Sequence, residues 1–365
     1  MLVGVPRETA TGETRVALVP DLVPPLRKAG LDVVVENGAG AMAGFPDAAF
    51  EQAGATRAAE ALANADFVLK VNPPAPEEID RFRTGAVLIG FLNPTGDRSR
   101  LEALAGRNVS AFAMERMPRI TRAQPMDALS AMSTVAGYKA VLLAANHLPK
   151  FFPLLMTAAG TIQPARVLII GAGVAGLQAI ATARRLGAVV EAYDTRPAVR
   201  EQVESLGGKF VDLGLDTGDA EAKTGYAKAQ SEEFYNRQRQ ALGEFVSRSD
   251  AVITTALVPG QRAPLLITED AVRAMRPGSV IVDLAAEQGG NCAVTKPGEN
   301  AVVHGVTILG PRNLPALLPY HASQMYARTV TSYLLHLFKN KALNIDLGDD
   351  LTKGPLVTHQ GKVMI

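Results

Sequence analysis

Residues 166–194, RVLIIGAGVAGLQAIATARRLGAVVEAYD, constrain the fold more than any other segment of the chain. The run VLII at 167–170 is short, apolar and rich in β-branched residues, which is typical of a strand buried on both faces of a parallel sheet. A glycine-rich turn follows, then a helix that ends at Gly187, then a second apolar strand at 189–193. The segment therefore predicts a βαβ unit of the kind that binds dinucleotides.

Three glycines of the turn fit the spacing G-x-G-x-x-G, and each has its own physical role. Gly171 allows the tight turn, Gly173 lets a pyrophosphate approach the backbone, and Gly176 lets the helix pack closely on the strand. The N–H groups at the helix start favour a phosphate. Asp194 ends the second strand, where its carboxylate is placed to bind the ribose hydroxyls of NAD and to repel a 2′-phosphate. Two cations follow and leave NADP as an alternative: Arg196 and Arg200.

Length and charge narrow the class of protein. A chain of 365 residues is long enough for two domains of ordinary size. The 37 Lys and Arg against 36 Asp and Glu give a net charge of +1, so charge provides no case for a nucleic-acid partner or an anionic membrane surface. Cys292 is the only cysteine, which excludes an intrachain disulfide and a thiolate metal cluster, and no metal site is expected.

The sequence predicts a cytoplasmic protein without a membrane span. The N-terminus, MLVGVPRETATGETR, lacks the basic and apolar regions of a signal peptide. The most apolar window, 128–145, carries Ser130, Ser133, Thr134, Tyr138 and Lys139, whereas a spanning helix needs about 20 predominantly apolar residues. This window is predicted to be a buried helix of a soluble protein.

Strand and helix patterns alternate along the chain and predict an α/β fold: two doubly wound Rossmann-like domains with mostly parallel sheets, joined by long helices across a cleft. The first domain is expected to comprise residues 1–130 and 314–365, the second, NAD-binding domain 151–313, and a bridging helix 131–150. Expected helices in the first domain include 47–53 and 58–64. Later strands of the second domain are expected at 251–255, 280–284 and 306–309.

Several polar residues lie where loops of such a fold carry function. Arg15 and Lys70 each lie beside a strand, and either bind an anionic substrate group or are ordinary solvated cations. The polar segment 117–125 holds directed hydrogen-bonding groups, although by itself it reads as a surface loop. Tyr226, in the long polar stretch 212–233, either folds onto a ligand or belongs to an excursion without a role. Loops after the last three strands should line the nicotinamide half of a cofactor site, with these residues among them: Thr255, Ala256, Leu257, Glu287, Gly289, Gly290, Asn291 and Asn313.

Segments spread over nearly the whole chain resemble one family. They include GETRVALVP, VLKVNPP, MPRITRAQPMD, REQVESLGGKF, TTALVPGQRAPLLIT and DLAAEQGGNC. Together with the glycine-rich unit, they are similar to the NAD(H)-binding component of proton-translocating nicotinamide nucleotide transhydrogenase, a relative of alanine dehydrogenase. The resemblance implies a homodimeric subunit that binds NAD(H) and docks on a partner holding NADP(H). A membrane-spanning subunit would couple hydride transfer to proton movement, so the chain would lie peripherally on the cytoplasmic side of the inner membrane.

The resemblance also implies roles for particular residues. Arg119, Gln124, Asp127 and Ser130 would hold the nicotinamide carboxamide and ribose and meet the NADP site. Tyr226 would be the mobile-loop tyrosine, although Thr224 stands where glycine is common. The further residues expected to contact the cofactor are Gly171, Gly173, Val174, Ala175, Gly176, Asp194, Thr195, Arg196, Gly225, Thr255, Ala256, Leu257, Glu287 and Asn313.

Two departures separate the chain from alanine dehydrogenase. Asn93 stands where that enzyme has a histidine, and asparagine cannot act as a general base. Glu287 replaces its catalytic aspartate, although the substrate arginine and lysine remain as Arg15 and Lys70. Transhydrogenation is therefore favoured, because direct hydride transfer requires positioning and no substrate proton transfer. The alternatives are an L-alanine dehydrogenase and a non-catalytic NAD(H) sensor.

Overall fold

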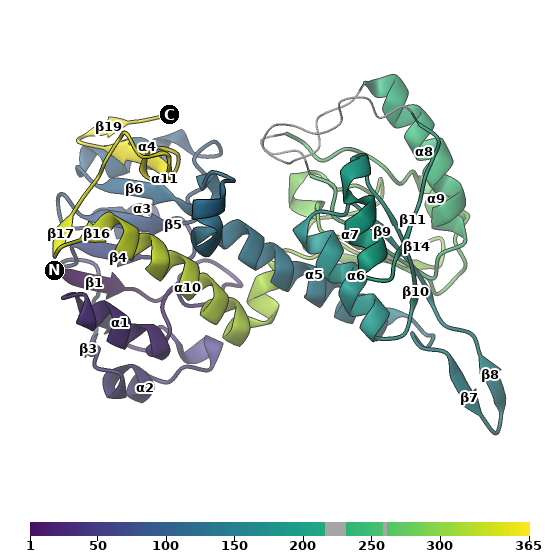
Figure 1. Cartoon of the computed structure of the whole chain (residues 1–365), viewed down its shortest axis with the longest axis horizontal. Helices are drawn as coiled ribbons and strands as arrows, with labels where there is room; N and C mark the ends of the chain where they lie inside the picture. The colour runs from purple at the N-terminus through teal and green to yellow at the C-terminus, as the bar shows by residue number, and fades with distance from the viewer. Residues whose placement is uncertain (216–230, 258–260) are drawn as a thin grey trace. The chain divides into compact units, whose positions relative to one another are not determined.

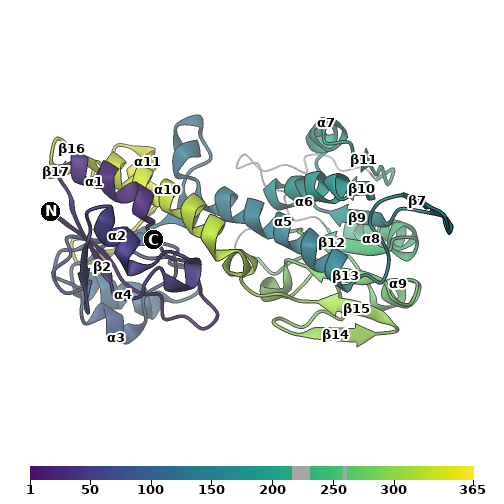
Figure 2. The same cartoon turned by 90° about the horizontal axis from the view of Figure 1, so that it is seen from below.

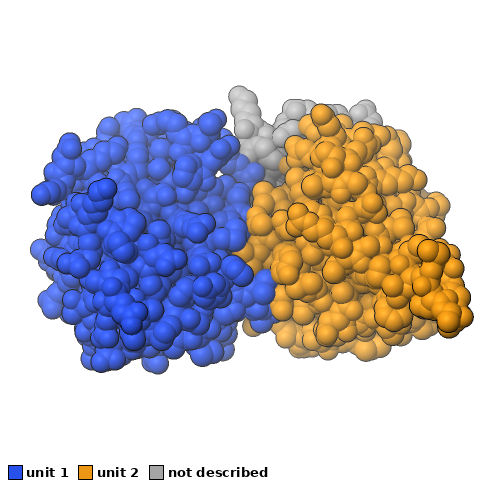
Figure 3. All heavy atoms as spheres, turned by 60° about the horizontal axis from the view of Figure 1, so that its bottom comes forward, with its two compact units in different colours: residues 1–132, 315–365 blue, residues 133–314 orange. Residues whose placement is uncertain are grey.

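The computed structural model describes residues 1–215, 231–257 and 261–365, which belong to two compact units (Figure 3). Unit 1 comprises Met1–Met132 and Pro315–Ile365, and unit 2 comprises Ser133–Leu314. Each unit contains one large, mostly parallel sheet with helices on both faces. The prediction of two doubly wound α/β units with mostly parallel sheets is confirmed.

Unit 2 contains a seven-stranded sheet in the order β11-β10-β9-β12-β13-β15-β14. All neighbours are parallel except β14 and β15. The order reverses between β9 and β12, and such a switch point is where ligands bind in doubly wound sheets. The strand bounds are β9 Arg166–Ile170, β10 Val189–Tyr193, β11 Lys209–Phe210, β12 Ala251–Thr254, β13 Val280–Asp283, β14 Asn300–Val303 and β15 Val306–Leu309.

Alternating apolar residues of these strands build two cores. Val167 and Ile169 face the core under α5 (Ala128–His147) and α6 (Val174–Arg185), which lie side by side in Figures 1 and 2. Leu168 and Ile170 face the core under α8 (Glu232–Ser247) and α9 (Glu269–Arg273). Burial on both faces explains why the strand sequence is continuously apolar. The other short helices of unit 2 are η5 Pro197–Val199, α7 Arg200–Ser205 and η6 Ala286–Gln288.

Unit 1 contains an eight-stranded sheet in the order β19-β18-β6-β5-β4-β1-β2-β3. Its six N-terminal strands are parallel, and the C-terminal β18 adds antiparallel to β6. The strand bounds are β1 Leu2–Val5, β2 Asp32–Glu36, β3 Thr56–Ala58, β4 Phe67–Leu69, β5 Val87–Gly90, β6 Ser110–Ala113, β18 Leu356–His359 and β19 Lys362–Val363. The order reverses between β1 and β4, so unit 1 has a switch point of its own.

Helices cover both faces of this sheet. On one face, Phe112 contacts Tyr333 of α10 (Pro319–Leu337), and Phe67 contacts Phe338, the residue after that helix. On the other face, Leu88 and its neighbours pack on α4. The helix bounds in unit 1 are η1 Pro20–Leu22, α1 Val23–Lys28, η2 Ala41–Ala43, α2 Asp47–Gln52, α3 Pro76–Ile79, α4 Arg98–Gly106, η3 Met114–Arg116, η4 Thr121–Met126, η7 Leu314–Leu317, α10 Pro319–Leu337 and α11 Asp350–Lys353.

The expected helix at 58–64 is wrong. After β3 the chain forms bends and a turn, and the Ala61 carbonyl lies against β1, where a Cβ on Gly4 would be only 2.1 Å from its oxygen. The Glu60 carboxylate accepts the Leu62 N–H at 2.8 Å. This local side-chain bond satisfies a backbone donor that a helix would otherwise require, so the apolar residues enter the core from a turn.

Several short strands have too little periodicity to be predicted from sequence. The hairpin of β7 (Leu155–Thr157) and β8 (Gly160–Ile162) projects from unit 2 in Figure 1. Strand β14 and the small antiparallel pair of β16 (Phe338–Lys339) with β17 (Ala342–Leu343) are further cases. Such two- to four-residue strands acquire their order from their partners rather than from their own pattern.

One helix of the described part of the chain, α5, is long and apolar enough to cross a membrane by length and composition. Its Ala140, Val141 and Ala144 lie in the core of unit 2. The core helix of a soluble protein passes the same test, so this helix is weak evidence for a span.

Candidate functional site

The turn after β9 requires glycine at two of its three motif positions for internal reasons. Gly171 has a φ of +98°, and a Cβ there would lie 2.6 Å from the Thr255 hydroxyl. A Cβ on Gly176 would lie 1.8 Å from the Gly171 carbonyl oxygen, so α6 packs directly on the turn. Both roles agree with those predicted from the spacing.

Gly173 differs, because the protein itself would accept a side chain there. Its φ of −75° is ordinary, and the nearest atom to an added Cβ is an Arg196 guanidinium nitrogen at 4.0 Å. Gly173 is also the N-cap of α6, and among the described residues no side chain accepts a hydrogen bond from the first turn of this helix. A bare backbone position beside uncapped helical N–H groups is the cradle that a pyrophosphate requires, so the residues fit a dinucleotide.

Asp194 is already surrounded by donors. Its Oδ2 accepts the Ala172 N–H at 2.7 Å and an Arg196 guanidinium N–H at 2.8 Å. Its Oδ1 accepts the backbone N–H and the Nε–H of Arg196, both at 2.9 Å. A ribose that binds this carboxylate must therefore share it with Arg196 or displace that side chain. Arg200 pairs with Asp212 at 2.7 Å and stacks on Phe210.

The loops after β12 and β13 meet beside this turn. The Thr255 hydroxyl donates to the Gly171 carbonyl at 2.9 Å, and Thr255, Ala256 and Leu257 are half-buried. Asn291 was expected to line the cofactor site, but it is fully buried and binds the Ala256 backbone instead. Most of the other expected residues are accessible to solvent, and Gly290 is buried. The exposed residues are Val174, Glu287 and Gly289, and the half-buried ones are Ala175, Thr195 and Asn313.

The segment 119–130 belongs to unit 1, where η4 precedes α5. The Asp127 carboxylate accepts the backbone N–H of Ser130 at 2.8 Å, which is the bond of a helix N-cap. It also accepts the Ser130 hydroxyl at 2.5 Å. The side chains of Arg119 and Gln124 are exposed. Asp127 and Ser130 therefore form one rigid pair at the start of α5.

A network that the sequence did not reveal anchors this segment. Arg122 in η4 forms an ion pair with Asp349 at 3.0 Å, and His336 of α10 contacts the other oxygen of Asp349 at 3.1 Å. Arg122 and Asp349 are 227 positions apart along the chain, so no local sequence pattern connects them.

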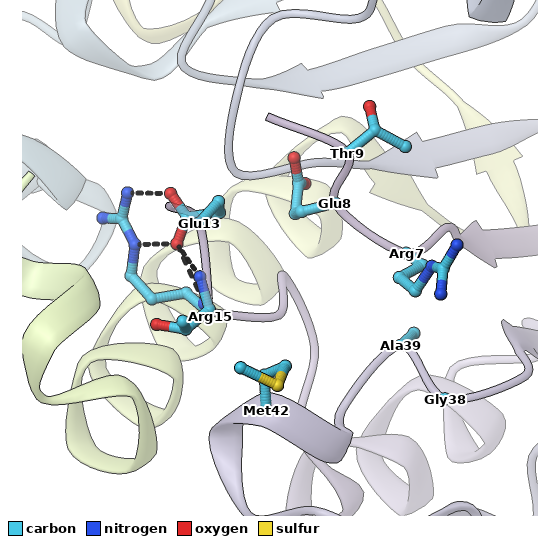
Figure 4. A pocket seen from close by; sticks show the side chains of 9 residues that line it. Arg7, Glu8, Thr9, Glu13, Arg15, Gly38, Ala39 and Met42 are labelled. Atoms are coloured by element: carbon cyan, nitrogen blue, oxygen red, sulfur yellow. Dashed lines mark hydrogen bonds and ion pairs between the residues drawn. The ribbon is translucent and has the colours of Figure 1, made fainter. Parts of the chain in front are cut away.

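Arg15 and Lys70 are not solvated cations, because each is buried against carboxylates of the protein itself. Arg15 is 5% exposed and its guanidinium grips the Glu13 carboxylate at 2.6 and 2.7 Å (Figure 4). Lys70 is fully buried between Glu78 at 3.0 Å and Glu8 at 3.5 Å. A pocket of about 340 Å³ opens near β1, lined by Arg7, Glu8, Thr9, Glu13, Thr14, Arg15, Gly38, Ala39 and Met42. Sequence reasoning missed these carboxylate partners.

The pKa values of two acids that line this pocket shift in opposite directions. Burial disfavours ionisation of Glu13, but the hydrogen bonds and charge of Arg15 outweigh it and lower its pKa to about 2. Burial raises the pKa of Glu8, against the opposing effect of Lys70. Both cations are thus balanced by the protein's own carboxylates.

The loop after β5 contains no proton-transfer group at the position expected for one. Asn93 adopts a φ of +47°, and its backbone N–H donates to the Glu115 carboxylate at 2.6 Å. The same Glu115 oxygen accepts the Leu92 N–H at 2.9 Å. Glu115 is therefore a half-buried support for the loop, and its partial burial raises its pKa.

The remaining predictions concern sulfur, metals and the polar stretch. Cys292 is 2% exposed, and burial raises its pKa to about 11, as a small packed residue would show. Within the described ranges no group of three or more His, Cys, Asp or Glu could hold a metal ion. Gly225 and Tyr226 lie outside the described residues.

Comparisons with known proteins agree with this architecture. Residues 4–136 match the family described as "Alanine dehydrogenase/PNT, N-terminal domain", and 140–365 match the corresponding C-terminal domain. An NAD(P) transhydrogenase alpha-subunit polypeptide of Rhodospirillum rubrum is 48% identical over 100% of this chain and 98% of its own length. The NAD(P) transhydrogenase subunit alpha of Cereibacter sphaeroides is 45% identical over 100% of this chain and 71% of its own length.

Solved structures separate the two branches of the family. A transhydrogenase from Sinorhizobium meliloti is 43% identical with a TM-score of 0.90, covering 100% of both chains. An L-alanine dehydrogenase is 30% identical with a TM-score of 0.82, covering 100% of this chain and 96% of its own. The chain therefore belongs to the alanine dehydrogenase/PNT family, within which it is more similar to transhydrogenase subunits than to this alanine dehydrogenase.

Proposed function

We propose that this chain is the NAD(H)-binding subunit of a proton-translocating transhydrogenase and exchanges a hydride with NADP(H) held on a partner subunit. The observation that carries the cofactor assignment is the glycine at position 173. The protein would tolerate a side chain there, so the missing side chain leaves room for a ligand. When bound, the nicotinamide would supply the hydride chemistry. The residues of the chain would hold and orient it, because hydride transfer needs the C4 atoms of the two nicotinamides within about 3–3.5 Å of each other.

The segment 119–130 supplies the orienting groups of this proposal. The Asp127–Ser130 pair is fixed at the start of a 20-residue helix, which limits the movement of both side chains. Gln124 and Arg119 are exposed on the preceding segment, and in this proposal Gln124 contacts the nicotinamide carboxamide. Asn93 in the loop after β5 fits a reaction without proton transfer, since an amide cannot serve as a base.

The proposed assembly is a homodimer on the cytoplasmic side of the inner membrane, attached through NADP(H)-binding and membrane-spanning subunits. The hairpin β7–β8 supports the homodimer, because a two-stranded hairpin is marginal alone and its Met156 is 80% exposed. Phe151 and Leu154 beside it are 56% and 49% exposed. Met156→Asp should convert dimers to monomers in analytical ultracentrifugation; an unchanged sedimentation coefficient would argue against this interface.

A mixing assay tests the function. The isolated chain should bind NADH, and hydride transfer to an NADP analogue should begin only when an NADP(H)-binding transhydrogenase component is added. Gln124→Asn should slow the transfer while leaving NADH affinity nearly unchanged. The shorter side chain keeps the amide group but no longer places it where it orients the nicotinamide. No rate increase on mixing would refute the function, and an equal loss of NADH binding in Gln124→Asn would refute the orienting role.

A further inference from the structure

Asn291, in the loop after β13, binds another loop of unit 2 through its side-chain amide. Its Nδ2 donates to the Ala256 carbonyl at 2.9 Å, and its Oδ1 accepts the Ala256 N–H at 3.1 Å. The same Nδ2 donates to the Pro264 carbonyl at 2.8 Å. Asn291 is fully buried, so water cannot replace these bonds. A primary amide is the side-chain group that both donates to and accepts from one residue's backbone in this way.

Asp283 fixes Asn291 in turn. Its Oδ2 accepts the backbone N–H groups of Asn291 at 2.8 Å and Cys292 at 3.1 Å. Its Oδ1 accepts the Thr254 hydroxyl at 2.9 Å and the Ala285 N–H at 3.0 Å. The carboxylate is fully buried and has a donor on each oxygen, which makes it a rigid support at the end of β13.

The hydrogen bonds between Asn291 and Ala256 are connected to the glycine turn through one residue, Thr255. Thr255 precedes the clamped Ala256, and its hydroxyl donates to the Gly171 carbonyl at 2.9 Å. The Gly171 carbonyl is also the atom on which Gly176 packs. The carboxyl ends of β13, β12 and β9 are therefore joined by successive hydrogen bonds at the switch point of the sheet.

We propose that Asn291 is a positioning residue for the dinucleotide site, which acts through Ala256 and Thr255 on the turn at Gly171. This inference rests on the proposed NAD(H) binding. Without the amide, two backbone carbonyls and one N–H lose their partners inside the protein, and the loop shifts to satisfy them. Thr255 would then leave the Gly171 carbonyl, and the turn would lose its binding geometry while the rest of the sheet stays folded.

Asn291→Asp tests the donor function with nearly the same shape. The ionised carboxylate cannot donate, so NADH affinity at about pH 8 should fall roughly tenfold. Burial and the neighbouring Asp283 raise the pKa of such a carboxyl, and on protonation its O–H can donate to one of the two carbonyls. The ratio of variant to wild-type affinity should therefore recover as the pH is lowered towards about 6. Because a buried charge also lowers the free energy of unfolding with the same titration, thermal unfolding at each pH shows that the variant is folded where its affinity is measured.

Two further variants provide the controls. Thr255→Val removes the hydroxyl bond to Gly171 at the carboxyl end of β12, and should weaken NADH binding equally at every pH. Ser249→Ala removes a side-chain bond of 2.7 Å, from its hydroxyl to the Phe245 carbonyl, just before β12, and should leave NADH affinity unchanged. Affinities are measured by NADH fluorescence, and thermal unfolding checks that each variant is folded.

The outcomes separate this inference from the function on which it rests. Absence of NADH binding by the wild-type chain would overturn the proposed function. Wild-type binding with an unaltered Asn291→Asp variant, or with a loss that does not depend on pH, would overturn the positioning role alone. If Asn291→Asp does not fold, Thr255→Val decides, and wild-type affinity in that variant would count against the relay.

Discussion

Gly173 offers a test in which stability and binding separate. In Gly173→Ala the new methyl group meets no atom nearer than 4.0 Å, and the backbone φ of −75° suits alanine. The substitution should therefore leave the free energy of unfolding within about 1 kcal/mol of the wild-type value, because alanine restricts the unfolded chain but is a poorer helix N-cap than glycine. For a unit of this size the midpoint of thermal unfolding should therefore stay within about 4 °C of the wild-type value.

Cofactor binding by the same variant should fall. The methyl group fills the gap through which the pyrophosphate approaches the backbone, and such overpacking costs about 1–3 kcal/mol. That cost corresponds to a dissociation constant for NADH that is roughly 5- to 150-fold higher. Fluorescence titration with NADH measures the affinity, and scanning calorimetry on the same preparation measures the stability.

Gly176→Ala is the matched control. Its methyl group would lie 1.8 Å from the Gly171 carbonyl oxygen, so α6 must move away from the turn. Both stability and NADH affinity should fall, with a loss of at least about 1–3 kcal/mol in the free energy of unfolding. Unchanged NADH affinity in a folded Gly173→Ala variant would show that the pyrophosphate does not approach at this turn.

Other predictions address specificity, acid stability and the thiol. Asp194→Asn should increase NADPH affinity relative to NADH by about tenfold in parallel titrations, because it removes the negative charge and releases the guanidinium of Arg196 for a phosphate; an unchanged ratio would contradict this. Glu13, with a pKa lowered to about 2 by Arg15, should contribute stability on the order of 3 kcal/mol that is complete above about pH 4.5 and lost as the pH falls towards 2. Urea unfolding should therefore show a smaller acid-dependent loss in Glu13→Gln than in the wild type. Cys292 should resist Ellman's reagent at about pH 8 until the protein unfolds, since burial raises its pKa to about 11; rapid labelling of the native protein would refute its burial.

The βαβ unit could be predicted from sequence because its signals are local and agree with one another. The expected strand at 189–193 coincides with β10, and the glycine turn adopts the expected roles. By contrast, the helix at 58–64 failed because the Ala61 carbonyl packs against Gly4 of another strand and the Glu60 carboxylate accepts the Leu62 N–H. The apolar composition of that segment was informative about burial and uninformative about conformation.

Partners of charged residues were beyond sequence reasoning. Lys70 depends on Glu8 and Glu78, and neither carboxylate is recognisable as its partner before the strands are assembled. Asp194 and Arg196 are two positions apart, yet the sequence did not reveal that one saturates the other. Asn291 was correctly associated with the loop after β13, but its burial depends on contacts with Ala256 and Pro264. The roles of Arg119, Gln124, Asp127 and Ser130 in transfer stay predictions.

The strand order of unit 1 has a consequence for biosynthesis. Strand β18 pairs with β6, and α10 fills one face of the sheet, so this unit is completed only by residues beyond 314. Unit 2 is continuous in the chain and can fold as it leaves the ribosome, whereas the earlier-synthesised strands of unit 1 must wait with the edge of β6 exposed. Release of the nascent chain before β18 would leave that edge open to pairing with other chains, and aggregation of such fragments would be the cost of the discontinuous design.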